Sequence, residues 1–155
     1  MKGLAFLLLS ACALWPQPGQ AAQNCRVQAP LLAFGEYIPG SPVAVESSAL
    51  VSVRCTGHPV TAFSVSIGPG SGGRTAERTL RSGAGILVYN LFVDAARTIV
   101  WGDGTGGTQR MAVVPPALRG ARPREAALTV YGRIPAGQDP APGTYSDTVV
   151  ITVEF

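Results

Sequence analysis

The chain is poor in the residue types on which most enzymes and nucleic-acid-binding proteins depend. It has one histidine, three cysteines and 7% aromatic residues among 155, and its charged fraction is 14%, against about 25% in ordinary soluble domains. The net charge is only +3, and no basic cluster is long enough for a nucleic-acid interface. We therefore expect no nucleic-acid partner, no metal site, no cofactor and no long charged helix.

Glycine and proline are plentiful instead, with 19 and 13 residues. They separate short runs that alternate in hydrophobicity, and no convincing amphipathic helix is found between them. The strand-like runs are residues 31–36, 49–55, 61–67, 86–93, 98–101, 110–114, 126–134 and 145–155. Short strands at this regular spacing predict a single all-β domain, an immunoglobulin-like β-sandwich.

The N-terminus has the features of a secretory signal peptide. Lys2 precedes an apolar run at residues 3–14, and Gly19 and Ala21 place small residues at positions −3 and −1 of a cleavage site. The run is too short to span a bilayer as a helix. We predict a signal peptide at residues 1–21 and a mature domain at residues 22–155.

A second interpretation of the same segment stays open. Leu9-Ser10-Ala11-Cys12 matches a bacterial lipobox, in which the cysteine is lipidated after cleavage. The protein would then be a lipoprotein anchored through Cys12. Under both interpretations the chain is exported.

Cys25 and Cys55 are the two cysteines that remain after cleavage at residue 21. A pair of cysteines in an exported protein indicates a disulfide, and the alternative is two unpaired buried thiols. Lys2 is the only lysine, so the mature domain has no lysine for a Schiff base or an isopeptide crosslink.

The run at residues 145–155 is the clearest strand and reaches the end of the chain. Alternate apolar residues share one of its faces: Val149, Ile151, Val153 and Phe155. If the sandwich stops at this strand, its seventh strand is missing and a hydrophobic edge is left open. A strand borrowed from another chain by β-augmentation would cover that edge.

Four segments together resemble the spore coat protein U domain family, secreted bacterial proteins that include many subunits of archaic chaperone–usher pili. They are CRVQAPLLAFGEYIPG, VSVRC, LVYNLFVDAARTIVWGDG and VYGRIPAGQDPAPGTYSDTVVITVEF. The resemblance covers the mature chain. It implies an incomplete immunoglobulin-like fold, a Cys25–Cys55 disulfide, and donor-strand complementation along the edge that carries Val149, Ile151, Val153 and Phe155.

The resemblance also implies partners and a location. They are a periplasmic chaperone, an outer-membrane usher and a neighbouring pilin subunit, with passage through the periplasm to the cell surface. Ala22, Gln23 and Asn24 are all that precedes Cys25 in the predicted mature chain, which leaves almost no donor segment. We expect a tip or other terminal subunit that acts in adhesion or biofilm formation. A self-sufficient secreted coat or binding protein is the alternative, and it would need an internal seventh strand, for example from residues 110–114.

Isolated residues provide weak arguments for other chemistry. A hydrolase would pair His58 with Asp94 or Asp103, but no nucleophile motif accompanies His58, so we predict an exposed loop residue and no enzymatic activity. A calcium loop at Asp103 would need further oxygen ligands. Residues 68–73 lack the Lys-Ser/Thr of a phosphate-binding loop, and we interpret them as a hairpin tip.

Two further features concern the surface and the core. Arg119, Arg122 and Arg124 form a small basic loop that is a candidate surface contact. Trp101 is either a binding aromatic at a strand end or a core residue, and we favour the core.

Overall fold

The computed structural model describes residues 24–56, 62–114 and 124–155, and their regular structure is β-strand apart from one short 3-10 turn. The elements are β1 (Asn24–Gln28), β2 (Val45–Thr56), β3 (Phe63–Ile67), η1 (Gly70–Gly72), β4 (Arg78–Ser82), β5 (Gly85–Phe92), β6 (Met111–Val113), β7 (Arg124–Ile134) and β8 (Ile151–Glu154). None of the helical structure in these ranges is long and apolar enough to cross a membrane.

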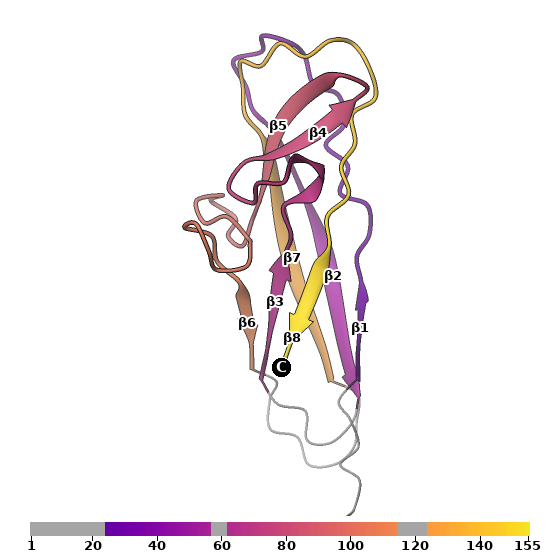
Figure 1. Cartoon of the computed structure of the whole chain (residues 1–155), viewed down its shortest axis with the longest axis vertical. Coiled ribbons are helices and arrows are strands. Elements are labelled where there is room, and N and C mark those ends of the chain that lie inside the picture. The colour runs from indigo at the N-terminus through magenta and orange to yellow at the C-terminus, as the bar shows by residue number, and fades with distance from the viewer. Residues whose placement is uncertain (1–23, 57–61, 115–123) are drawn as a thin grey trace, which may run out of the picture.

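The strands form two antiparallel sheets. One has the order β1-β2-β7-β5-β4 and the other the order β6-β3-β8. Figure 1 shows the smaller sheet in front of the long β2–β7 pair. The predicted β-sandwich is therefore confirmed, and its core lies between the sheets. Core residues of both sheets include Val51, Val53, Val65, Ile67, Leu87, Leu91, Leu128, Val130 and Ile134.

β2 and β7 form a long antiparallel ladder in the larger sheet. It runs in register from Val45↔Ile134 to Cys55↔Arg124. Side chains alternate between the two faces of a strand, so every second residue points to the core. In β2 the inward residues become fully buried toward its end, and Val53 is 0% exposed.

A disulfide joins Cys25 to Cys55, as the sequence predicts. The two residues lie opposite each other in the β1–β2 register, and their Cα atoms are 4.0 Å apart. The disulfide therefore attaches the short edge strand β1 covalently to β2.

Trp101 closes one side of the sandwich. Its backbone N–H donates to Leu91 O (2.8 Å) on the larger sheet, and its indole N–H donates to Val65 O (2.9 Å) on the smaller one. An isolated bridge pairs Trp101 with Gln109, just ahead of β6. The side chain is 0% exposed, so Trp101 is a core residue, as we favoured from the sequence.

A buried arginine reinforces the same side. The Arg78 side chain is fully buried, and its guanidinium donates to Gly68 O (2.9 Å), Ile67 O (2.8 Å) and Trp101 O (2.8 Å). It also donates to Asn90 Oδ1 at 2.6 Å. Because a buried charge needs such partners, these hydrogen bonds tie β4 and β5 of the larger sheet to the end of β3 in the smaller one.

The structure corrects four expectations about local structure. Residues 98–101 form no strand, because Val100 and Trp101 make only isolated bridges. Residues 31–36 form no strand, whereas β1 and β4 are strands that the sequence analysis did not predict. Residues 68–73 are a crossover between the two sheets that contains η1, and so they are not a hairpin tip. The predicted final strand is shorter, because only Ile151–Glu154 pairs in a ladder.

The disulfide generates the first prediction. Replacing both cysteines (Cys25→Ser with Cys55→Ser) should lower the free energy of unfolding by about 3 kcal/mol, because a loop with a sequence separation of 30 is no longer closed in the unfolded chain. Urea denaturation of the oxidised protein measures this loss. Reductant should bring the wild type to the level of the variant and leave the variant unchanged, and a wild type indifferent to reductant would contradict the prediction.

Candidate functional site

The sandwich is open along the side opposite Trp101. β8 pairs with β3 alone, and β1 pairs with β2 alone, so within the described ranges no strand covers the outer edge of either. In Figure 1, β1 lies at the right-hand edge of the larger sheet and β8 lies in front of that sheet, with β2 visible behind and between them. A sheet edge without a neighbouring strand is a template for pairing with another chain.

Inward-facing side chains of the open edge are incompletely covered. Val149, Ile151 and Val153 pack against the core but are only partly buried. On the neighbouring strand β3, Val65 and Ile67 face the same core and are 0% and 2% exposed. The apolar face of the C-terminal strand therefore retains contact surface that the chain itself does not fill.

Phe155 differs from the other three members of the predicted edge. It is 62% exposed and lies one residue beyond the end of β8. The structure thus places Val149, Ile151 and Val153 along the core and leaves Phe155 outside it.

A hollow lies between the segment that follows the end of β1 and the segment that precedes the start of β8. Its volume is about 710 Å³, and it lies between residues 31–37, which follow β1, and residues 140–147, which lead toward β8. Leu80, Leu87 and Ile134 also line it. We call residues 31–37 the first lip and residues 140–147 the second lip of the groove.

The first lip lies low over β7 because residue 132 is a glycine. A Cβ atom on Gly132 would stand 2.7 Å from the Phe34 ring and 3.0 Å from Leu32. The distance to Phe34 is shorter than real Cβ contacts, so any side chain at position 132 would require the Phe34 ring to move. Gly132 therefore lets two apolar residues of the lip cover the larger sheet.

The second lip is anchored through Asp147. Its carboxylate accepts hydrogen bonds from Ser71 N (2.8 Å), from the Tyr89 hydroxyl (2.7 Å) and from Thr148 N (2.8 Å). Burial disfavours the charged form of Asp147, but these hydrogen bonds outweigh it and hold its pKa below the usual range. Asp147 is therefore an anionic anchor at neutral pH.

Tyr89 lies beneath both lips. Its ring meets the Phe34 ring edge to face, with centroids 5.9 Å apart, and its hydroxyl donates to Asp147. Burial and the Asp147 hydrogen bond raise the pKa of the Tyr89 hydroxyl far above its ordinary value, so the hydroxyl remains a donor. The sequence patterns pointed to neither Tyr89 nor Asp147. The two residues are 58 positions apart, so no local pattern could connect them.

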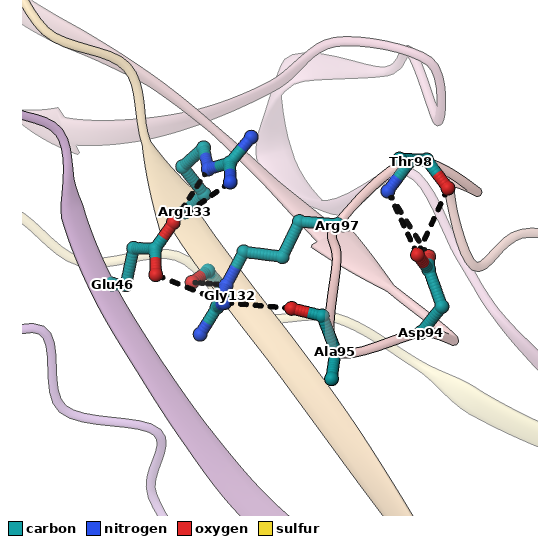
Figure 2. Close-up of polar contacts among 7 residues, drawn as sticks. All are labelled: Glu46, Asp94, Ala95, Arg97, Thr98, Gly132 and Arg133. Atoms are coloured by element: carbon teal, nitrogen blue, oxygen red, sulfur yellow. Dashed lines mark hydrogen bonds and ion pairs between the residues drawn. The ribbon is translucent and has the colours of Figure 1, made fainter.

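A charged cluster fixes the loop that follows β5 (Figure 2). Glu46 accepts from Arg133 on the paired strand and forms an ion pair with Arg97 at 2.9 Å. Arg97 also donates to Gly132 O and Ala95 O, and it adopts φ 56°, a conformation uncommon for a residue with a side chain. These hydrogen bonds hold the loop to β2 and β7, so we assign the cluster a structural role.

The remaining sequence candidates that lie in the described ranges form no second site. His58, Arg119 and Arg122 lie outside the described residues, and so does the side chain of Arg124. Asp94 accepts hydrogen bonds from Thr98 and Ile99, and Asp103 accepts them from Thr105, so both carboxylates close their own turns. Within the described ranges no group of three or more potential metal ligands occurs.

The lowered pKa of Asp147 predicts a pH dependence of stability. A carboxyl with a lower pKa in the folded state stabilises the fold above its unfolded pKa of about 4, and that contribution is lost as the pH falls through the folded value. Urea denaturation should therefore show Asp147→Asn to be less stable than the wild type at neutral pH, with the difference shrinking below about pH 4.

Asp139→Asn is the control, because it removes one negative charge from an exposed position. It should stay close to the wild type over the same range. A gap between Asp147→Asn and the wild type that does not change with pH would contradict the prediction.

Comparisons with known proteins agree with this architecture. Protein U of Myxococcus xanthus is 35% identical over 136 residues, which cover 80% of this chain and 71% of that protein. A solved structure, the CsuC-CsuE chaperone–tip adhesion subunit pre-assembly complex from archaic chaperone–usher Csu pili of Acinetobacter baumannii, matches with a TM-score of 0.57 and 24% identity over 86% of this chain. The match covers 40% of that solved chain, less than half its length. The Spore Coat Protein U domain matches residues 17–152, and the chain belongs to this family.

Proposed function

We propose that the protein is an exported structural subunit of a chaperone–usher type pilus that accepts a donor strand along its open side. The observation that carries the proposal is the incomplete burial of Val149, Ile151 and Val153 beside the buried apolar residues of β3. An exposed hydrophobic edge strand is a hazard unless a partner covers it. A partner strand would make main-chain hydrogen bonds to β8 and place its apolar residues in the groove.

Hydrophobic burial supplies the driving force for this exchange. Each apolar side chain of the donor that becomes fully buried contributes about 1.5–3 kcal/mol, before the cost of association. The hollow between the lips adds apolar wall from Leu80, Leu87 and Ile134. A donor strand of ordinary length would therefore be held strongly and without any covalent chemistry.

The proposed partners follow from this mechanism. A periplasmic chaperone would cover the edge first, and an outer-membrane usher would replace it with a strand of a neighbouring subunit. The Cys25–Cys55 disulfide supports passage through an oxidising compartment to the cell surface. We propose no enzymatic activity, because strand exchange needs no catalytic group.

A terminal position in the fibre, with a role in adhesion or biofilm formation, is the finer part of the proposal. It is supported by the likeness to the Csu chaperone–tip adhesion subunit complex. The prediction of a signal peptide at residues 1–21, and the alternative of lipidation at Cys12, concern residues outside the described ranges. Mass spectrometry of the mature N-terminus distinguishes the two.

The self-sufficient coat or binding protein is disfavoured by one observation. It would need residues 110–114 to act as the missing strand beside β8. In the structure these residues contribute β6, which pairs with β3 on the side away from β8. The described part of the chain therefore supplies no strand of its own for the open edge.

Donor-strand binding can be tested with a synthetic peptide of about ten residues in which valine and threonine alternate. At a concentration about 100 times its dissociation constant, this peptide should raise the thermal midpoint of the oxidised full chain by about 5–10 °C, followed by circular dichroism. Ile151→Asn places a polar group in the groove and should abolish the rise. Thr152→Asn, on the outward face of the same strand, should retain it.

Val153→Thr is a second variant, for the case that Ile151→Asn does not fold. Threonine is nearly isosteric with valine, so this substitution changes polarity and hardly changes volume. It should fold and show a smaller rise than the wild type. A wild-type chain whose midpoint the peptide does not change, or an equal rise in Ile151→Asn and Thr152→Asn, would refute the acceptor groove.

A further inference from the structure

We propose that the hydrogen bond between Tyr89 and Asp147 is a positioning device that sets the two lips of the groove for strand binding. The inference rests on the proposed function, because it concerns how the groove accepts a strand. It assigns a role to two residues that no local sequence pattern connects.

The C-terminal segment changes sheets at Asp147. Ser146 exchanges two backbone hydrogen bonds with Arg81 of β4, at 2.9 and 3.1 Å. Four residues later Val150 O accepts from Gly68 N at 2.8 Å, and the β3–β8 ladder begins. Between these points the segment leaves the edge of the larger sheet and joins the smaller one.

Side-chain hydrogen bonds replace the ladder at this crossing. Asp147 binds Ser71 N in η1 through one carboxylate oxygen and the Tyr89 hydroxyl through the other. The close approach needs a glycine at position 70, because a Cβ there would collide with the Asp147 carboxylate. The path of the second lip therefore depends on one carboxylate held from two sides.

Tyr89 connects this anchor to the first lip. Its ring packs edge to face on Phe34, which lines the hollow together with Asp147. Tyr89 itself is 4% exposed and lies opposite Arg78 in the β4–β5 register. The buried Tyr89 side chain thus contacts the first lip through its ring and the second lip through its hydroxyl.

This arrangement favours binding by reducing its entropic cost. A lip that is already fixed loses less freedom when a strand pairs with it. If the Tyr89–Asp147 hydrogen bond is removed, the second lip must be ordered by the incoming strand. The affinity for a strand should then fall, although Tyr89 itself does not line the hollow.

The test uses the alternating valine–threonine peptide and the oxidised full chain. Tyr89→Phe removes only the hydroxyl and keeps the ring on Phe34, and Asp147→Asn removes the charge. Each variant should bind the peptide about tenfold more weakly. The loss of affinity in the double variant should be smaller than the product of the two single losses, because both substitutions weaken the same Tyr89–Asp147 contact.

Two matched controls separate positioning from general destabilisation. Tyr131→Phe removes a hydroxyl from the same sheet but keeps the ring beneath the Arg97 guanidinium. Asp103→Asn perturbs a carboxylate that accepts hydrogen bonds only within its own turn. Both controls should bind the peptide as the wild type does.

Hydrogen exchange of the free protein provides a readout that needs no peptide. The Ser146 amide, and the amides of the β3–β8 ladder, should exchange faster in Tyr89→Phe and Asp147→Asn, while those of the β2–β7 ladder should not. Unchanged exchange and unchanged affinity, or losses that multiply in the double variant, would overturn the positioning role alone. A wild-type chain that binds no peptide would instead overturn the proposed function and this role with it.

Discussion

A fully buried guanidinium holds together a sandwich whose other side is open. Arg78 donates to carbonyls at the end of β3 and to Trp101, and Trp101 itself donates to Val65 and Leu91. Burying a charge is costly unless every donor finds a partner, and here the partners come from both sheets. The two layers are therefore fastened along one side, and the fold does not rely on the missing contacts between β1 and β8.

The described strands differ in how many contacts hold them in place. β2 and β7 pair over their whole length, and the disulfide ties β1 to them. The C-terminal segment has no such support: it borrows one bridge from β4, one carboxylate anchor at Asp147 and a short ladder with β3. A partner strand would thus be added along a segment with little regular structure of its own. The opposite side of the sandwich is held by the buried hydrogen bonds of Arg78 and Trp101.

Sequence patterns predicted β2, β3, β7 and β8, because in each of them alternate residues are apolar and face the core. They missed β4, since Arg78 and Leu80 point inward and an inward arginine breaks the apolar alternation. They also assigned a strand to residues 31–36, whose apolar side chains cover the larger sheet although their backbone joins no ladder. The inward face of β8 was predictable from its own alternation, whereas the Tyr89–Asp147 contact depends on a fold that brings distant positions together.

The relative direction of the two open edges has a consequence for any strand that enters between them. Figure 1 shows β1 and β8 pointing in opposite directions. An inserted strand must therefore run antiparallel to one edge and parallel to the other, and it can do so in two ways. Antiparallel pairing is the slightly more stable of the two patterns, and β8 carries the larger uncovered apolar face. Two otherwise similar strands that differ only in polarity would thus form complexes of unequal stability, so that one can displace the other without an external source of energy.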